Sequence, residues 1–227
     1  MKNLIKLSLT VAFMALIINA NAQFDKSKLK LGIKAGLNLA DIAQDFKNSE
    51  EESDTKMSLG LAIGLVAEYE IQENLAFQSG LMLTRKGYKI DESADGEKYE
   101  EKVKVTYLEI PLHLAYKMDA FQFYAGPYIA FGLSGKWEEE YSYDEETEKY
   151  DGDIVFGNDR KDAKEGEMMI RGFDAGLDFG VGYQTGPILI NAGYSLGLSN
   201  LMADPNEDDD KVFNRVFKLS VSYFFGK

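Results

Sequence analysis

The stretch VTYLEIPLHLAYK, residues 105–117, alternates between two kinds of side chain. One set is large and apolar and consists of Leu108, Ile110, Leu112, Leu114 and Tyr116. The other set is mixed and includes Glu109, His113 and Lys117. A period of two is the period of a β-strand, because successive Cβ atoms point to opposite sides of a sheet. The stretch therefore predicts a strand with one apolar face and one polar face.

Seven further segments alternate in the same way. The eight predicted strands cover residues 29–39, 57–70, 75–88, 105–117, 121–134, 172–184, 188–198 and 217–225. Their number is even, and their lengths match the roughly 9–11 residues that a tilted membrane-spanning strand needs. Pro111 has no N–H to donate to a neighbouring strand, so we expect a bulge or a local break of the ladder there.

The connections between these segments alternate in length. Tight turns at residues 71–74, 118–120 and 185–187 alternate with long connections at residues 40–56, 91–102, 135–167 and 200–213. Outer-membrane barrels have short periplasmic turns and long external loops in this alternation. A soluble β-sandwich has no reason to sort its loops by length, so the order favours a membrane barrel.

The acidic residues are concentrated in the four long connections. The formal net charge is −13, and the four long connections, counted from residue 137 in the third, hold 30 acidic and 9 basic residues. These connections carry −21 and the rest of the chain +8, so the acidity belongs to one end of the molecule. A strongly acidic chain is a poor partner for nucleic acid, which we therefore exclude.

The first 22 residues have the pattern of a secretory signal. Lys2 and Lys6 precede an apolar run, and Ala20-Asn21-Ala22 matches a small-residue cleavage site. We expect cleavage after Ala22 and a single barrel domain at residues 23–227. An uncleaved N-terminal anchor is the alternative. The chain has no cysteine, which excludes disulfides and thiolate metal sites.

Two kinds of barrel compete for the alternating pattern. A periplasmic soluble barrel would turn the apolar rows inward around a ligand, whereas a membrane barrel turns them outward into lipid. The interior of eight strands is only just filled by side chains, so the row with Gly176, Gly180 and Gly182 suits it and rows of bulky residues do not. Aromatic residues near the row ends fit an interfacial girdle, namely Tyr69, Phe121, Phe123, Tyr183, Tyr223 and Phe225.

The fold class predicted is therefore all-β, an eight-stranded antiparallel up-and-down transmembrane barrel with long acidic external loops. Charges that face a narrow lumen need partners. We expect an internal ion-pair network that plugs the barrel, formed by Lys30, Lys34, Lys117 and Lys218 with Glu68, Glu70, Glu109, Asp174 and Asp178.

The sequence resembles the PorT-like outer-membrane β-barrel family. The resemblance is carried by YLEIPLHLAYK (107–117), YAGPYIAFGLS (124–134), GFDAGLDFGVGYQ (172–184), NAGYSLGLSNL (191–201), SVSYFF (220–225) and RKGYK (85–89). It implies a barrel in the outer membrane of a Gram-negative bacterium with both termini in the periplasm, and a link to protein secretion through the founding member. The aromatic-ended last strand also resembles the signal that the barrel insertion machinery reads.

Few residues suggest chemistry. His113 lies four residues after Glu109 on one strand face, and a barrel enzyme (a protease or a lipid-modifying enzyme) using His113 is one alternative. Asp204, Asn206, Asp208 and Asp210 alternate like calcium-loop ligands, but the glycine and the final glutamate of such a loop are missing. A solvated acidic loop is the preferred interpretation, and we assign no catalytic, cofactor or metal site.

The segment at residues 137–153 alternates enough to extend strands beyond the membrane as a protruding sheet, with disorder as the alternative. The function predicted is a non-enzymatic structural or interaction role at the cell surface. Its expected partners are outer-membrane lipid and lipopolysaccharide, the insertion machinery during assembly, and a protein bound at the external loops, including residues 138–167.

Overall fold

The computed structural model describes residues 25–45, 54–94, 97–143, 146–203 and 210–225. The signal expected at residues 1–22 lies outside these ranges. The strands are β1 (Leu29–Asp45), β2 (Thr55–Gln72), β3 (Leu75–Ala94), β4 (Glu97–Met118), β5 (Phe121–Tyr143), β6 (Glu146–Phe156), β7 (Met168–Ile170), β8 (Phe173–Thr185), β9 (Ile188–Gly197) and β10 (Lys211–Phe225). Two 3₁₀ turns, η1 (Lys26–Lys28) and η2 (Arg160–Asp162), complete the described elements.

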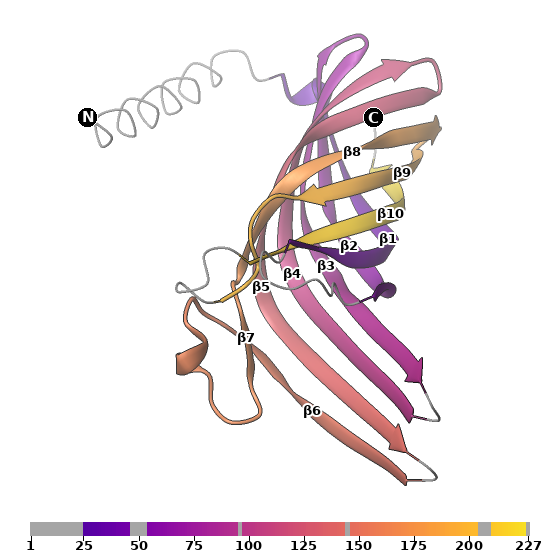
Figure 1. Cartoon of the computed structure of the whole chain (residues 1–227). Coiled ribbons are helices and arrows are strands. Elements are labelled where there is room, and N and C mark those ends of the chain that lie inside the picture. Colours follow the sequence, from indigo (N-terminus) through magenta and orange to yellow (C-terminus); the bar gives the residue numbers. More distant parts are fainter. Residues whose placement is uncertain (1–24, 46–53, 95–96, 144–145, 204–209, 226–227) are drawn as a thin grey trace, which may run out of the picture.

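Eight strands form a closed ring (Figure 1). The order β4-β3-β2-β1-β10-β9-β8-β5 is closed by the pairing of β4 with β5, and every neighbouring pair in the ring is antiparallel. The predicted eight-stranded antiparallel barrel is thus confirmed. The remaining two strands, β6 and β7, extend the sheet from β5 and lie outside the ring.

The apolar rows face outward. In the opening stretch Leu112, Leu114 and Tyr116 are exposed, whereas Glu109 and His113 are buried in the lumen. The same holds around the ring, where exposed side chains include Leu61 (62% exposed), Leu219 (55%) and Phe179 (48%). A soluble barrel would bury these rows, so that alternative is wrong, and a continuous apolar exterior fits a hydrocarbon surrounding. No helix within the described ranges has the length and apolar character to cross a bilayer.

Several strands continue well past the predicted ends. In Figure 1, β3, β4, β5 and β6 project together from one end of the ring. We call this projecting sheet the external platform, and it comprises residues 91–94, 97–102, 137–143 and 146–153. The long connections expected at residues 91–102 and 135–167 are therefore in large part sheet. The protruding-sheet interpretation of residues 137–153 is confirmed over the residues described.

Pro111 interrupts the hydrogen-bond ladder between β3 and β4 but does not change the register of the two strands. The pairing of β4 with β3 skips the two positions Ile110 and Pro111 and resumes in the same register, so Pro111 causes a local break and no bulge. The bulge of this hairpin lies instead on β5 between Gly132 and Ser134, where the register with β4 shifts by one residue. Because one extra residue reverses which side chains face inward, Trp137 points to the inner side of the sheet.

Beyond β6 the chain folds back over the barrel mouth. Residues 157–170, which we call the flap, contain η2 and end in β7, which pairs in parallel with the end of β6. The indole Nε1 of Trp137 donates to the carbonyl oxygen of Gly166 at 3.2 Å. Gly152 leaves the space for this contact, since a Cβ there would lie 2.0 Å from Gly166 O and 2.6 Å from Trp137 Nε1.

We expect Gly152→Val to release the flap without unfolding the barrel. The added side chain removes the space that Trp137 and Gly166 share, so limited trypsin digestion should cut at Arg160, Lys161 and Lys164 severalfold faster than in the unmodified protein. The neighbouring Asp151→Val, whose side chain points to the opposite face of β6, is the matched control. Equal cleavage rates in both variants would contradict this account of how the flap is held.

Candidate functional site

The lumen is filled by charged side chains, and its centre is Lys86. Lys86 Nζ lies 2.8 Å from Glu109 Oε2 and 2.9 Å from Asp174 Oδ2, and its side chain has no exposed surface. The same ammonium group lies 4.2 Å from the ring centroid of Tyr128. Two carboxylates and an aromatic face therefore surround a lysine that has no access to solvent.

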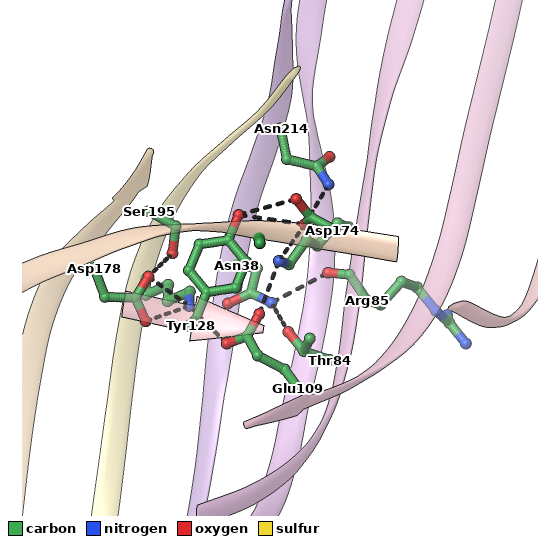
Figure 2. Close-up of polar contacts among 12 residues, drawn as sticks. Asn38, Thr84, Arg85, Glu109, Tyr128, Asp174, Asp178, Ser195 and Asn214 are labelled. Atoms are coloured by element: carbon green, nitrogen blue, oxygen red, sulfur yellow. Dashed lines mark hydrogen bonds and ion pairs between the residues drawn. The ribbon is translucent and has the colours of Figure 1, made fainter. Parts of the chain in front are cut away.

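Asp174 accepts further hydrogen bonds, from Tyr128 and Asn214, as Figure 2 shows. It accepts from Asn214 Nδ2 at 2.8 Å and from the Tyr128 hydroxyl at 3.2 Å. Next to it, Asn38 Nδ2 donates to Thr84 Oγ1 at 2.7 Å and to the Arg85 carbonyl oxygen at 3.1 Å. Buried charges are tolerated when their remaining lone pairs and protons are satisfied in this way.

A second cluster surrounds Asp178. Lys218 Nζ lies 2.8 Å from Glu109 Oε1 and 3.2 Å from Asp178 Oδ2, so Glu109 links the two clusters. His113 Nε2 is 3.0 Å from Asp178 Oδ2, and Ser195 Oγ donates to Asp178 Oδ1 at 2.5 Å. The network thus runs continuously from Asp174 through Lys86 and Glu109 to His113.

A third cluster closes the end near the tight turns. Glu68 pairs with Lys117 and Lys30 and accepts from Gln78 Nε2 at 2.8 Å. The predicted plug is confirmed for Lys30, Lys117, Lys218, Glu68, Glu109, Asp174 and Asp178. Within the described ranges Lys34 and Glu70 form no ion pair within 4.0 Å. Lys34 nevertheless faces the lumen as predicted, because it lines the same small cavity as Glu109 and Asp178. Lys86, which the prediction omitted, makes two of the shortest contacts.

His113 belongs to the buried polar network of the lumen. Its carboxylate partner is Asp178 and not Glu109, because the inward faces of β4 and β8 meet across the lumen. Ser195 donates to Asp178, whereas a nucleophilic serine must donate to the histidine. The cavity lined by His113, Tyr124 and Lys218 measures about 30 Å³, which leaves space for about one water molecule.

Above the plug, the barrel opens into a larger space. This mouth cavity has a volume of about 670 Å³ and lies between the inner faces of β3, β4 and β5, the flap and residues 201–202. Its floor includes Lys86 and Asn214, which belong to the plug. The walls are largely apolar and comprise Ile42, Val103, Val105, Tyr107, Trp137, Met168, Met169, Ile170, Leu201, Met202 and Val212.

The outer face of the external platform carries paired charges. Glu100 accepts hydrogen bonds from Lys102 Nζ at 2.7 Å and Lys98 Nζ at 3.0 Å. These two contacts, that from Lys102 first, lower the pKa of Glu100 from 4.5 to about 2. Across the sheet Lys149 contacts Glu140 at 2.8 Å. Glu100 and Glu140 face each other on β4 and β5, and each is balanced by its own lysines.

We expect Glu100 in the folded protein to titrate near pH 2. A carboxyl whose pKa is lowered by folding stabilises the platform above its unfolded pKa, and this contribution is lost as the pH falls through about 2. Carboxyl ¹³C NMR of labelled protein measures the midpoint. Lys102→Met should raise it toward 4.5, whereas Lys104→Met on the same strand face should not. A midpoint already near 4.5 in the unmodified protein would refute the pairing.

No group of His, Cys, Asp and Glu suited to a metal ion occurs among the residues that the structure describes. The alternating acids considered for calcium fall at residues 204–210, of which only Asp210 is described. The structure therefore places no metal ligands together within the ranges it covers, and the calcium hypothesis lies outside them.

A family model described as an outer membrane protein beta-barrel domain matches residues 21–203. No curated protein matches the sequence.

Among solved structures, Ail of Yersinia pestis is similar at 13% identity, covering 86% of this chain and 98% of Ail, with a TM-score of 0.38. Neisserial surface protein A is 13% identical over 86% of this chain and 97% of its own, with a TM-score of 0.40. OprG of Pseudomonas aeruginosa is 13% identical over 87% and 96%, with a TM-score of 0.35. These likenesses concern the fold alone.

Proposed function

Because the chain belongs to the outer membrane protein β-barrel domain family and lies in the outer membrane, we propose that it is a non-enzymatic interaction protein at the cell surface. In this proposal the barrel is an anchor, and the external platform binds a positively charged protein partner. Contacts with outer-membrane lipid and lipopolysaccharide, and with the insertion machinery during assembly, belong to the same proposal and follow from the location.

The filled lumen supports an anchoring role for the barrel. Lys86, Glu109 and Asp178 bridge the interior in one network, and the cavity beside them holds about 30 Å³. A diffusing solute needs a continuous water-filled path, and among the described residues these ion pairs lie across that path. The same packing makes the barrel a rigid base, because strands on opposite sides of the ring are joined by buried ion pairs.

The observation that carries the proposal is the external platform itself. It is a regular four-stranded sheet with 12 acidic and 3 basic residues, so its field attracts basic surfaces. The outer edge of β6 is unpaired over residues 146–153 within the described chain, since β7 pairs only with residues 154–156. An unpaired edge can accept a further strand, and the surrounding acids select a partner with lysine or arginine.

A crosslinking experiment tests this proposal. A photoreactive amino acid at Glu148, on the platform, is compared with one at Leu219, on the lipid-facing wall. We expect a specific protein adduct from position 148 in intact cells, which weakens with added salt because exposed charge pairs are screened. Replacing Glu138, Glu140 and Glu146 with glutamine should reduce the adduct by about tenfold, which corresponds to about 1.4 kcal/mol.

The matched control replaces Glu165 and Glu167 of the flap with glutamine, which removes charge outside the platform. Recovery of the same adduct from the platform variant and the unmodified protein would refute recognition by this surface.

The proposal that the protein is not an enzyme has a separate test. His113→Ala should leave every measurable phenotype unchanged. The resemblance to the PorT-like family suggests a component of the protein secretion machinery as the partner of the platform. An assay of secreted proteins after deletion of the gene tests this prediction.

A further inference from the structure

The mouth cavity has the size of a small-molecule site. Its volume of about 670 Å³ falls within the range of roughly 300–1,000 Å³ that ligand pockets occupy. Val103, Val105 and Tyr107 of β4 line the cavity together with Met168, Met169 and Ile170 of the flap. Methionine side chains adapt their shape to an apolar body of variable outline. The cavity is therefore suited to a ligand that is mostly apolar.

The charges around the cavity disfavour an ionised ligand. The positive charge of Lys86 at the floor is already balanced by the carboxylates of Glu109 and Asp174, so Lys86 does not favour the binding of an anion. At the rim, Arg160 is accompanied by Glu139 and Glu167. Burial and the neighbouring Glu101 raise the pKa of Glu139, so this carboxyl already lies in unfavourable surroundings for charge. An anion would meet further repulsion from the external acids, and a cation would have to be desolvated among apolar walls.

One buried polar atom in the wall has no hydrogen-bond partner among the residues that the structure describes. This atom is the side-chain oxygen of Gln44, which lines the cavity. A buried acceptor without a donor is uncommon in proteins and costs about 1–3 kcal/mol. A ligand with an N–H or O–H group at this position would supply the missing hydrogen bond.

From these three features we infer that the mouth cavity is a binding site for a small neutral apolar molecule with one hydrogen-bond donor. The walls bind the apolar body and the Gln44 oxygen accepts the donor. The flap is part of the site, because without residues 168–170 the cavity loses one of its walls. This inference does not depend on partner binding by the platform, because the outer charged face and the free edge of the platform lie outside the cavity.

Ligand binding in the cavity can be measured by tryptophan fluorescence, because Trp137 lines the cavity and is the single tryptophan of the chain. The probe is N-phenyl-1-naphthylamine, a neutral apolar fluorophore with one N–H, titrated into the full-length protein in lipid nanodiscs. We expect saturable energy transfer from Trp137 at one probe per barrel, above the linear background from the bilayer. The matched ligand is 8-anilinonaphthalene-1-sulfonate, which adds an anionic group to the same scaffold and should bind at least about tenfold more weakly.

Two variants locate the probe. Val105→Phe fills the cavity and should abolish the saturable transfer, and Gln44→Leu should weaken binding by about fivefold, the worth of one net hydrogen bond. Val181→Phe, on the lipid-facing wall where the valine is 47% exposed, is the control and should bind as the unmodified protein does. Native mass spectrometry of each variant confirms the stoichiometry. Linear transfer only, or equal saturation in Val105→Phe and Val181→Phe, would overturn the inference.

Discussion

Replacing Lys86 with methionine is expected to lower the free energy of unfolding by about 3–5 kcal/mol, because it leaves two carboxylates buried without a cation. The side chain of Lys86 is fully buried, and Glu109 and Asp174 are each within 3 Å of its ammonium group. Methionine conserves most of the volume, so the loss is electrostatic and leaves no large cavity. Urea titration of the protein in lipid vesicles, followed by Trp137 emission, measures the change.

Two controls separate this effect from a general loss of charge. Lys98→Met removes an exposed pair with Glu100 and should leave the urea midpoint unchanged. Adding Glu109→Gln and Asp174→Asn to Lys86→Met should recover much of the stability, since the uncompensated charges are then gone. If Lys86→Met were as stable as Lys98→Met, the plug would not contribute to holding the barrel together.

The barrel could be predicted from the sequence because the lipid imposes a simple rule. Every outward position of a membrane strand must be apolar, so the period of two is visible in each of the eight segments. The row from Leu108 to Tyr116 faces outward as expected, and Glu109 and His113 face the lumen. The alternation fixes which face each side chain lies on, but it says nothing about which strands meet across the lumen.

For that reason the sequence predicts most of the charged residues that face the lumen, but it does not predict which of them contact each other. The partner of His113 is Asp178, 65 residues away along the chain, and the pairing depends on the stagger between β4 and β8. Lys86 was absent from the predicted network, because its role follows only from its contact with Asp174, 88 residues further on. The period of two alone places this lysine on the inward face of β3, and only a contact across the ring identifies its partners.

The mouth cavity could not be predicted from the sequence, because the bulge in β5 changes which side chains face inward. Extending the alternation of residues 121–134 in a straight line would place Trp137 on the outer face, together with Phe131 and Leu133. The extra residue between Gly132 and Ser134 reverses the faces, so Trp137 enters the cavity and holds the flap. No residue type marks this bulge, because neither glycine nor proline is required at the inserted position.

A lysine in place of Val221 is the sharpest test of the surroundings of the barrel, with an expected loss of about 2–4 kcal/mol. Val221 is 47% exposed, lies in the middle of the outward row of β10, and pairs with Ala35 and Ile190 on the two neighbouring strands. In water such a substitution would remove an exposed apolar side chain at little cost. In hydrocarbon the ammonium group must be desolvated or must reach the interface, so the free energy of unfolding in lipid vesicles should fall.

The matched substitution is Tyr143→Lys on the external platform, where the tyrosine is 61% exposed. Both changes replace an exposed side chain of a strand with lysine, at one site surrounded by lipid and at the other by water. We expect Tyr143→Lys to leave the urea midpoint unchanged, because surface substitutions in water have small effects. Equal stability of the two variants would mean that water wets the outward rows, and the inward charges could then no longer be explained as the plug of a membrane barrel.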